Sequence, residues 1–486
     1  MATPRSKWLI LAIIAIAQFM VILDTSIVNV ALPAIQKALN FSSPTSLQWI
    51  VTAYTLAFGG FLLLGGRAAD LYGRKKMFLL GVGGFTLSSL AVALSNTSNI
   101  LIVLRAVQGL SAAFMSPAAL SILLITFRDG EDRNKALSVW SAVAAGGAAA
   151  GVLFGGILTQ YLGWRWDFLV NLPVGIIVSI IAYRILPAHE SEATHTSLDL
   201  PGAALVTSGL MLLVYGLVKA PTNGWNSANT IYMLGGAAAL LVAFVINEFR
   251  AKHPLVDLNI FRQGNVAAAN VTQMAITATL FSMFFFLSLY IQQVLGYSPV
   301  RSGLAFLPIT FIIGMTATYV GRIIGRVGFK PFMVVAPLIL ASALYLLAGV
   351  PVHGSYLHNV LPGLIIMAIG LGMSFVSLTI AATAGVAPDK SGLASGLINT
   401  SQQIGGALGL AILSGVSTSA ITKYITDAHQ IVTPSLRVEA TVSGFHAAFH
   451  VGMGFAIAAS VITFIFVRSN RAPKATTSDA PVVMAH

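Results

Sequence analysis

The stretch GRAADLYGRKK, residues 66–76, is a short charged segment between two long apolar runs. A degenerate copy, GRIIGRVGFK at residues 321–330, also lies between apolar runs. Gly66 and Gly321 are 255 residues apart, and a second glycine and a lysine follow each of them at the same spacing. A loop that occurs twice, about half a chain apart, indicates that a larger unit has been duplicated.

The composition predicts a polytopic membrane protein. The chain has 486 residues, of which 56% are apolar and 9% charged, and its mean hydropathy is +0.85. A soluble domain carries roughly 25% charged residues. The net charge of +12 is explained by basic residues in cytoplasmic loops, so the expected surroundings are a lipid bilayer and not a nucleic acid. The absence of cysteine excludes disulfides and thiolate metal sites, and we expect no metal and no cofactor.

Apolar runs long enough to span a bilayer, which requires about 20 residues, occur fourteen times. They lie near residues 8–32, 47–66, 77–95, 100–125, 136–159, 166–187, 199–219, 229–248, 265–295, 302–323, 331–350, 358–383, 397–420 and 445–467. An even count places both termini on one side. With the N-terminus inside, twenty Lys and Arg residues fall in inside loops, six in outside loops and one within a span. This asymmetry predicts a multi-pass protein of the plasma or inner membrane with both termini in the cytoplasm.

Two further matches follow the repeated loop. Gly109 and the residues after it match Gly370 at an offset of 261, and Asp132 with its downstream glycines matches Asp389 at 257. The first and ninth spans also begin about 257 residues apart. These offsets predict an all-α protein with two parallel six-helix bundles and a two-helix insertion between them. The expected units are 1–187 (first bundle), 188–262 (insertion), 263–469 (second bundle) and 470–486 (polar, disordered cytoplasmic tail).

Four motifs carry a resemblance to a known family. They are LDTSIVNVALP in the first span (23–33), the loop at 66–76, RAVQG in the fourth span (105–109) and the junction WRWDFLVNLP (164–173). Together they resemble the major facilitator superfamily, and specifically its fourteen-span drug:proton antiporter family. One departure is Val152, which stands where the family's fifth-helix motif has proline.

Asp24 is the only carboxylate, and Arg105 the only basic residue, well inside an expected span. Each costs about 2.5–3.5 kcal/mol at a helix centre if unpaired. At 1.5 Å per residue Asp24 lies roughly 24 Å along a core of about 30 Å, and Arg105 lies about 8 Å from the opposite entry. Both are therefore in the outer third, and we predict that they pair or share a water-filled cavity. The resemblance implies that Asp24, Arg105 and Gln108 couple transport to protons; a static ion pair that fixes helix packing is the alternative.

The resemblance also implies a conformational latch at the cytoplasmic face. The alternative is a basic loop that only sets topology. Gly325 stands where the second copy would have Asp70, so we expect a latch on one side only. The latch residues would be Gly66, Arg67, Asp70, Gly73, Arg74 and Lys75.

Polar residues within the spans are candidates for a substrate cavity, although each could equally make hydrogen bonds between helices. They are Asn29, Gln48, Tyr54, Asn171, Gln273, Gln292, Asn399 and Gln402. A stripe of small residues in the fifth span predicts close helix packing. It consists of Gly147, Gly151, Gly155 and Gly156.

The expected function is secondary active export by alternating access, with protons entering in exchange for a lipophilic small molecule. The resemblance implies drugs, dyes or antibiotics as substrates. Export of an endogenous metabolite, such as a siderophore, an amino acid or an antibiotic precursor, is an alternative, and a non-transporting membrane sensor is another. The sequence has no P-loop and no catalytic motif, so we expect neither an ATP-driven pump nor an enzyme. We expect a monomer.

Overall fold

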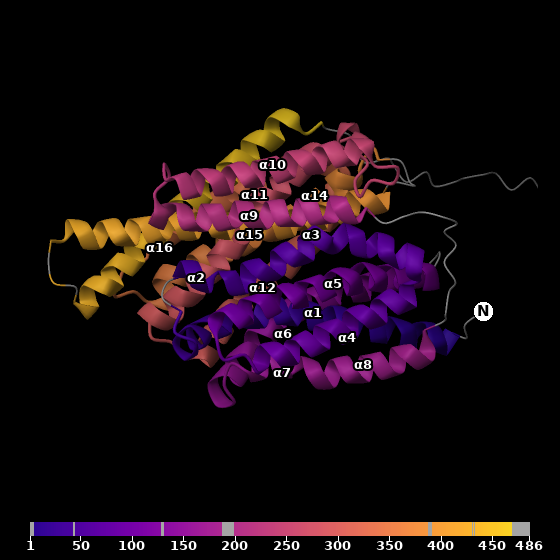
Figure 1. The fold of residues 1–486 in the computed structure, drawn as a ribbon, viewed down its shortest axis with the longest axis horizontal. Helices are drawn as coiled ribbons and strands as arrows, with labels where there is room; N and C mark the ends of the chain where they lie inside the picture. The colour runs from indigo at the N-terminus through magenta and orange to yellow at the C-terminus, as the bar shows by residue number, and fades with distance from the viewer. Residues whose placement is uncertain are drawn as a thin grey trace, which may run out of the picture.

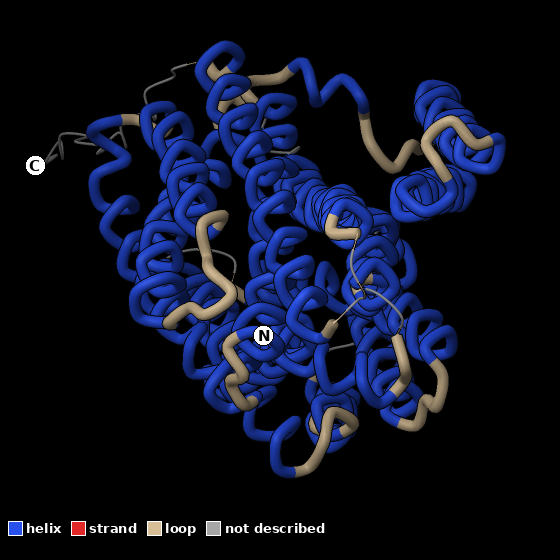
Figure 2. The backbone as a smooth tube through the Cα atoms, turned by 90° about the vertical axis from the view of Figure 1, so that its left-hand side faces the viewer, coloured by secondary structure: helices blue, strands red, loops and turns tan. Residues whose placement is uncertain are grey.

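A computed structural model describes residues 4–41, 44–127, 131–186, 199–386, 391–429, 431 and 433–468. The regular structure of this part of the chain is helical throughout. The helices run along the long axis of the molecule (Figure 1), and Figure 2 shows most of them nearly end-on, packed side by side. The expected tail at 470–486 and the start of the expected insertion, 188–198, lie outside the described residues.

The first part of the chain forms long helices joined by short connections, with two single-turn helices, α2 and α7, among them. The elements are α1 (Pro4–Ala38), α2 (Pro44–Leu47), α3 (Trp49–Tyr72), α4 (Arg74–Ala93), α5 (Ser98–Thr126), α6 (Glu131–Tyr161), α7 (Trp166–Leu169) and α8 (Asn171–Ile185).

The second part contains eight long helices and three short 3₁₀ or π segments. The elements are α9 (Leu200–Asn223), α10 (Ala228–Arg250), η1 (Leu258–Arg262), α11 (Val266–Leu289), η2 (Tyr290–Val294), α12 (Pro299–Val327), α13 (Lys330–Leu347), η3 (Tyr356–Val360), α14 (Leu361–Thr383), α15 (Ser391–Asp427) and α16 (Pro434–Phe466).

Thirteen helices in the described part of the chain are long and apolar enough to cross a membrane. They correspond to thirteen of the fourteen expected spans. The remaining span, expected at 136–159, coincides with α6, which has 31 residues but is not among the thirteen. Part of α6 lies outside the residues whose side chains the structure describes, so the fourteenth span stays a prediction.

The two copies of the charged loop adopt the same backbone turn. Gly73 separates α3 from α4 with φ of 93°, and Gly328 separates α12 from α13 with φ of 87°. Both values lie in the left-handed region, which glycine adopts without steric cost. The glycine repeated in the sequence therefore performs the same task in both places: it ends one long helix so that the next can start at once.

The helix contacts of the first half recur in the second half. α1 packs against α5, α6 and α8, and α11 packs against α14, α15 and α16. Likewise α5 packs against α3 and α4, and α14 against α12 and α13. The halves meet where α6 contacts α12 and α3 contacts α15.

The helices α9 and α10 lie at the upper edge of Figure 1. α9 packs on α3 and α15, while α10 packs chiefly on α9. Only 11% of the most apolar window of α10 is buried, the smallest share among the thirteen helices. This pair is therefore attached to the outside of the other helices.

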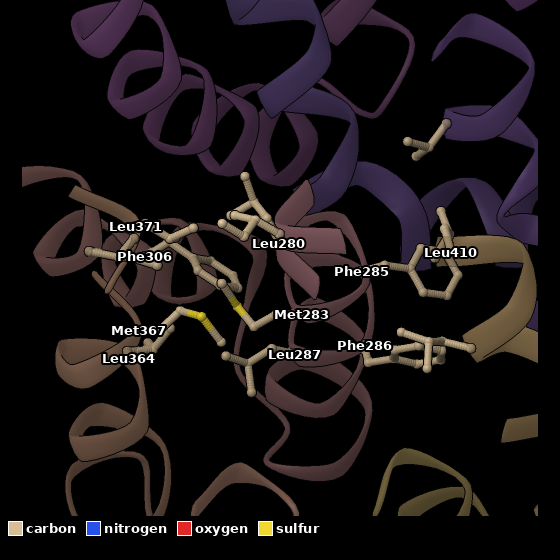
Figure 3. Packing of buried hydrophobic residues seen from close by; sticks show 14 of the residues in the cluster. Leu280, Met283, Phe285, Phe286, Leu287, Phe306, Leu364, Met367, Leu371 and Leu410 are labelled. Atoms are coloured by element: carbon tan, nitrogen blue, oxygen red, sulfur yellow. The ribbon is translucent and has the colours of Figure 1, made fainter. Parts of the chain in front are cut away.

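The largest apolar cluster is centred on α11. Figure 3 shows Leu280, Met283, Phe285, Phe286 and Leu287 pointing to different sides of this helix, toward side chains of α12, α14 and α15. All five are at most 9% exposed. A helix with apolar contacts on every side is a central helix, so we describe α11 as the central helix of this cluster.

Candidate functional site

The ion pair expected from equal depth is present. Arg105 Nη1 on α5 lies 2.6 Å from Asp24 Oδ2 on α1, and the two side chains are 1% and 0% exposed. A buried charge is tolerated when it is paired and its remaining hydrogen-bonding capacity is satisfied. A second ion pair, Arg74 with Asp70, lies at the surface, where solvent screens it.

Asp24 accepts hydrogen bonds from side chains of two other helices, α5 and α8. Gln108 Nε2 donates to Asp24 Oδ1 over 2.8 Å, and Asn171 Nδ2 donates to the same oxygen over 3.2 Å. Gln108 lies one turn after Arg105, so both side chains project from one face of α5. Ser89 Oγ on α4 accepts from both Gln108 and Asn171. The carboxylate is thus held by α5 and α8 and, through Ser89, by α4.

Arg105 is also fixed independently of Asp24. Its Nε donates to the Ile50 carbonyl over 3.1 Å, and its Nη1 donates to Gln108 Oε1 over 2.6 Å. The Tyr54 ring centroid lies 4.4 Å from its Cζ and that of Phe168 lies 5.6 Å away. Cation–π contacts of this kind contribute about 2 kcal/mol when desolvated. Arg105 therefore keeps several partners if Asp24 becomes neutral, which suits a site where a proton comes and goes.

The glycine stripe brings α6 directly onto α1. A Cβ atom at Gly151 would lie 2.7 Å from the Leu23 carbonyl oxygen, and one at Gly155 would lie 2.8 Å from Ile27. Gly147 lies on the same side, against Ile22, whereas Gly156 faces the backbone of α12 at Pro299. The stripe thus packs the helix that carries Asp24 at close range, and its last member contacts the other half.

The residues expected to form a latch lie at the end of α3 and the start of α4. Arg74 Nη2 is 3.4 Å from Asp70 Oδ1 in a surface ion pair, and Arg67 is exposed. Lys75 Nζ donates to the Tyr183 carbonyl over 2.7 Å and lies 5.4 Å from its ring, so it ties this loop to α8. Gly66 packs near Pro117 of α5.

The expected cavity residues do not gather in one place. Asn171 and Tyr54 belong to the Asp24–Arg105 site, and Gln292 Nε2 donates to the Val30 carbonyl over 3.0 Å. Asn29 Nδ2 donates within its own helix to Thr25. The others are scattered: Gln48 and Gln273 are buried with unpartnered amide atoms, Gln402 is half-buried and Asn399 is exposed.

Other carboxyl groups are buried close to the ends of spans, which was not expected from the sequence. Asp167 on α7 is 0% exposed and Glu248 on α10 is 5% exposed, and both lie in helices long and apolar enough to cross a membrane. The sequence contained a signal for Asp167, because an acidic residue stands within the aromatic run at 164–168. Its position at the expected boundary of the sixth span made it look interfacial. Among the described residues no group of three or more His, Cys, Asp or Glu side chains could hold a metal ion.

Comparisons with known proteins place these features in context. Residues 14–410 match the Major Facilitator Superfamily. The puromycin resistance protein pur8 of Streptomyces alboniger is 37% identical over 489 residues, which cover 99% of this chain and 95% of that protein. The cephamycin export protein CmcT of Amycolatopsis lactamdurans is 39% identical over 408 residues, 83% of each chain. Among solved structures, a bacterial homolog of the human lysosomal transporter Spinster, inward-facing and occupied, superposes with a TM-score of 0.71 at 16% identity, covering 97% and 98% of the two chains; this likeness shows the fold alone.

Proposed function

Because the chain belongs to the Major Facilitator Superfamily, we propose that it is a proton-coupled secondary exporter of lipophilic small molecules that works by alternating access. Relatives named for antibiotic resistance and antibiotic export align with most of the chain, which supports drugs or antibiotics as the substrate class. The observation that carries the proton coupling is the buried, fully hydrogen-bonded Asp24–Arg105 pair. No cofactor other than the proton is needed for this mechanism.

We propose fourteen spans, with α6 as the fourteenth, in two parallel six-helix bundles at 1–187 and 263–469. The support is the recurrence of each helix contact: α1 with α6 corresponds to α11 with α15, and α4 with α8 to α13 with α16. The contacts between halves recur too, since α6 with α12 corresponds to α15 with α3. The segment 188–262 is then an insertion whose helices pack on the outside of both bundles.

We assign the N-terminus and the latch loop to the cytoplasmic side of the cell membrane, on the basis of the charge asymmetry of the loops. The helix ends on the other side are in contact across the halves. Ser288 Oγ donates to the Asn29 carbonyl over 2.6 Å, and Gln293 Nε2 donates to Gln36 Oε1 over 2.8 Å. With this orientation the structure is closed toward the outside, which is one half of an alternating-access cycle.

The energetics of the ion pair suit this role. Protonation of Asp24 leaves Arg105 without its counter-ion, and an unpaired buried charge costs about 3–5 kcal/mol. One proton that crosses about 150 mV releases roughly 3.4 kcal/mol. Because the two quantities are similar, the proton gradient can break and restore the pair in each cycle. Gln108, Tyr54 and the Ile50 carbonyl hold Arg105 in place meanwhile.

Purified protein in liposomes with an imposed pH gradient and a trapped pH-sensitive dye tests the proposal. We expect lipophilic compounds to accelerate proton flux in the wild type and not in Asp24→Asn, which retains the size of the side chain. Substrate-dependent flux that is equal in both proteins would remove Asp24 from the mechanism. A wild type that shows no flux with any compound of a broad panel would contradict proton-coupled drug export itself.

A further inference from the structure

A second buried carboxyl group lies beside the Asp24–Arg105 site and has no role in the mechanism above. Asp167 on α7 is fully buried. Thr159 Oγ1 on α6 donates to its Oδ2 over 2.5 Å, while its Oδ1 has no hydrogen-bond partner. A carboxyl oxygen that is shielded from water and unpartnered is unusual enough to require an explanation.

No cation neutralises Asp167 among the described residues. The neighbouring Arg165 points away and donates to the Ala93 carbonyl over 2.9 Å and to the Ser95 carbonyl over 3.2 Å. Arg105 is engaged with Asp24. An isolated buried carboxylate is far more costly than a neutral carboxylic acid. The surroundings therefore suit a carboxyl group that carries a proton in this conformation.

Asp167 is connected to the Asp24 site through its own helix. Phe168, the next residue, contacts Arg105, and Asn171, one turn further on, donates to Asp24. A proton on Asp167 is thus held on the segment that contacts both members of the Asp24–Arg105 pair.

The elements that pack against α7 are α1, α4, α6 and α8. Besides Asp24, their titratable side chains toward the same end of the molecule as α7 are Lys37 on α1 and Tyr161 on α6. The remaining described charged side chains of these helices lie in or near the terminal turns at the opposite end; they are Lys7, Arg74, Lys75, Lys76, Asp132, Arg133, Lys135 and Arg184.

The hydrogen-bond partner of Asp167 also lies where the two halves meet. Thr159 is followed by Gln160, whose Oε1 accepts a hydrogen bond from the Val300 amide of α12 over 3.2 Å. Gly156, one turn earlier, packs against the backbone of α12 at Pro299. Separation of α6 from α12 at this end would therefore open the face of the α6 end that lies next to Thr159, the hydrogen-bond partner of Asp167.

We propose that Asp167 is the outer proton relay of this transporter. It takes a proton from the external water when α6 and α12 separate, holds it when they close, and passes it to the Asp24 carboxylate as Arg105 releases that group. One proton binds to Asp167 and the same proton leaves it for Asp24, so the number of protons moved per substrate is unchanged. The inference rests on the proposed proton-coupled export.

The relay predicts a specific dependence on external pH. When Asp167 is protonated from the external water, it can transfer a proton to Asp24 in every cycle. Wild-type flux should therefore level off as external pH falls. Without the relay, Asp24 must be protonated directly from water, and flux should rise about tenfold per unit of decreasing external pH. If Asp167 had only a structural role, its substitution would reduce the flux by the same factor at every pH.

The experiment measures substrate-dependent proton flux in liposomes across a series of external pH values. We expect Asp167→Asn to lose the plateau while its proton-to-substrate ratio and substrate affinity stay at the wild-type values. Thr159→Val, which keeps the carboxyl group and removes only the hydroxyl, is the matched control and should retain a plateau. Asp167→Asn with the wild-type pH profile, or with flux reduced equally at every pH, would overturn the relay while leaving export intact; a wild type without flux would overturn both.

Infrared spectroscopy provides a second route if Asp167→Asn does not fold. In protein that carries Asp24→Asn and Glu248→Gln, the absorption of a protonated buried carboxyl group should persist near neutral pH and disappear when the external pH is raised. Absence of that absorption would overturn the proposal.

Discussion

The helix pairs α1–α5 and α11–α14 occupy corresponding places in the two halves, but only one of them carries charge. An offset of 257 residues leads from Asp24 to Phe281, and an offset of 261 leads from Arg105 to Ile366. The first pair is joined by a buried ion pair with its hydrogen bonds. The second pair lies in the apolar cluster of Figure 3, where Met367 and Leu371 of α14 face α11.

This difference shows which interactions hold such helix pairs together and which must have another role. Both pairs pack in the same way, so the ion pair is not required to hold two such helices together. Replacing a buried ion pair by apolar residues of similar size is often neutral or stabilising. The charges in the first half therefore have a cost that packing does not explain, whereas the proposed proton coupling would explain it.

The largest expected effect comes from removing one charge or both. Arg105→Met alone leaves Asp24 buried without a counter-ion, and we expect a loss of about 3–5 kcal/mol in the free energy of unfolding. Asp24→Leu combined with Arg105→Met makes the first half resemble the second and should recover most of that loss. Thermal unfolding in detergent measures both, and liposome assays should find neither variant coupled. A double variant as unstable as the single one would show that the charges are structural.

The converse change introduces charge into the second half. Phe281→Asp places a carboxyl group on α11 with no arginine at the corresponding position of α14, and we expect a cost of about 2.5–3.5 kcal/mol. Phe281→Leu is the control and should cost less than about 1.5 kcal/mol. Unfolding measurements compare the two. Equal stabilities would mean that this part of the second half is already hydrated and could hold a charge.

The sequence predicted the Asp24–Arg105 pair because helix direction and rise per residue place both side chains at a similar depth, and few other charged residues lie within the spans. It did not predict that Asn171 and Ser89 complete the site. Those contacts join α8 and α4, and they depend on how each helix is rotated about its axis. Packing between helices sets this rotation, and hydropathy carries no information about it. Gln108 was expected at the site from the resemblance of the RAVQG motif.

For the fold, the sequence predicted where the long helices lie but not which residues near their ends are buried. Fourteen spans were expected from apolar runs, and thirteen of them correspond to helices long and apolar enough to cross a membrane. The run at 136–159 coincides with α6, part of which lies outside the described side chains. The burial of Asp167 was not predicted. A charge at the end of a span is inexpensive when it reaches water, and only the folded structure shows that α7 turns it inward.

The next prediction concerns the glycines that both halves use for close packing. A Cβ at Gly151 would lie 2.7 Å from the Leu23 carbonyl oxygen, and one at Gly409 would lie 2.3 Å from Ala278 Cα. Since backbone must move in each case, Gly151→Ala and Gly409→Ala should each cost about 1–3 kcal/mol. Gly146→Ala, with no atom within 4 Å of the new Cβ, is the control. If Gly151→Ala is as harmless as this control, close contact between α6 and α1 is not needed.

The smallest expected effect concerns the lysines that end the two charged loops. Lys75 Nζ lies 5.4 Å from the Tyr183 ring and donates to the Tyr183 carbonyl. Lys330 Nζ lies 5.8 Å from the Phe464 ring and donates no hydrogen bond within the described part of the chain. A cation–π contact at a partly exposed site contributes about 0.5–1 kcal/mol, and the extra hydrogen bond to a charged donor adds to Lys75 alone. Lys75→Met should therefore destabilise the protein more than Lys330→Met, by about 1 kcal/mol in unfolding free energy. The reverse order would mean that the loops differ in some way other than this hydrogen bond, and that the resemblance between the halves at their cytoplasmic ends is looser than the shared glycine turn indicates.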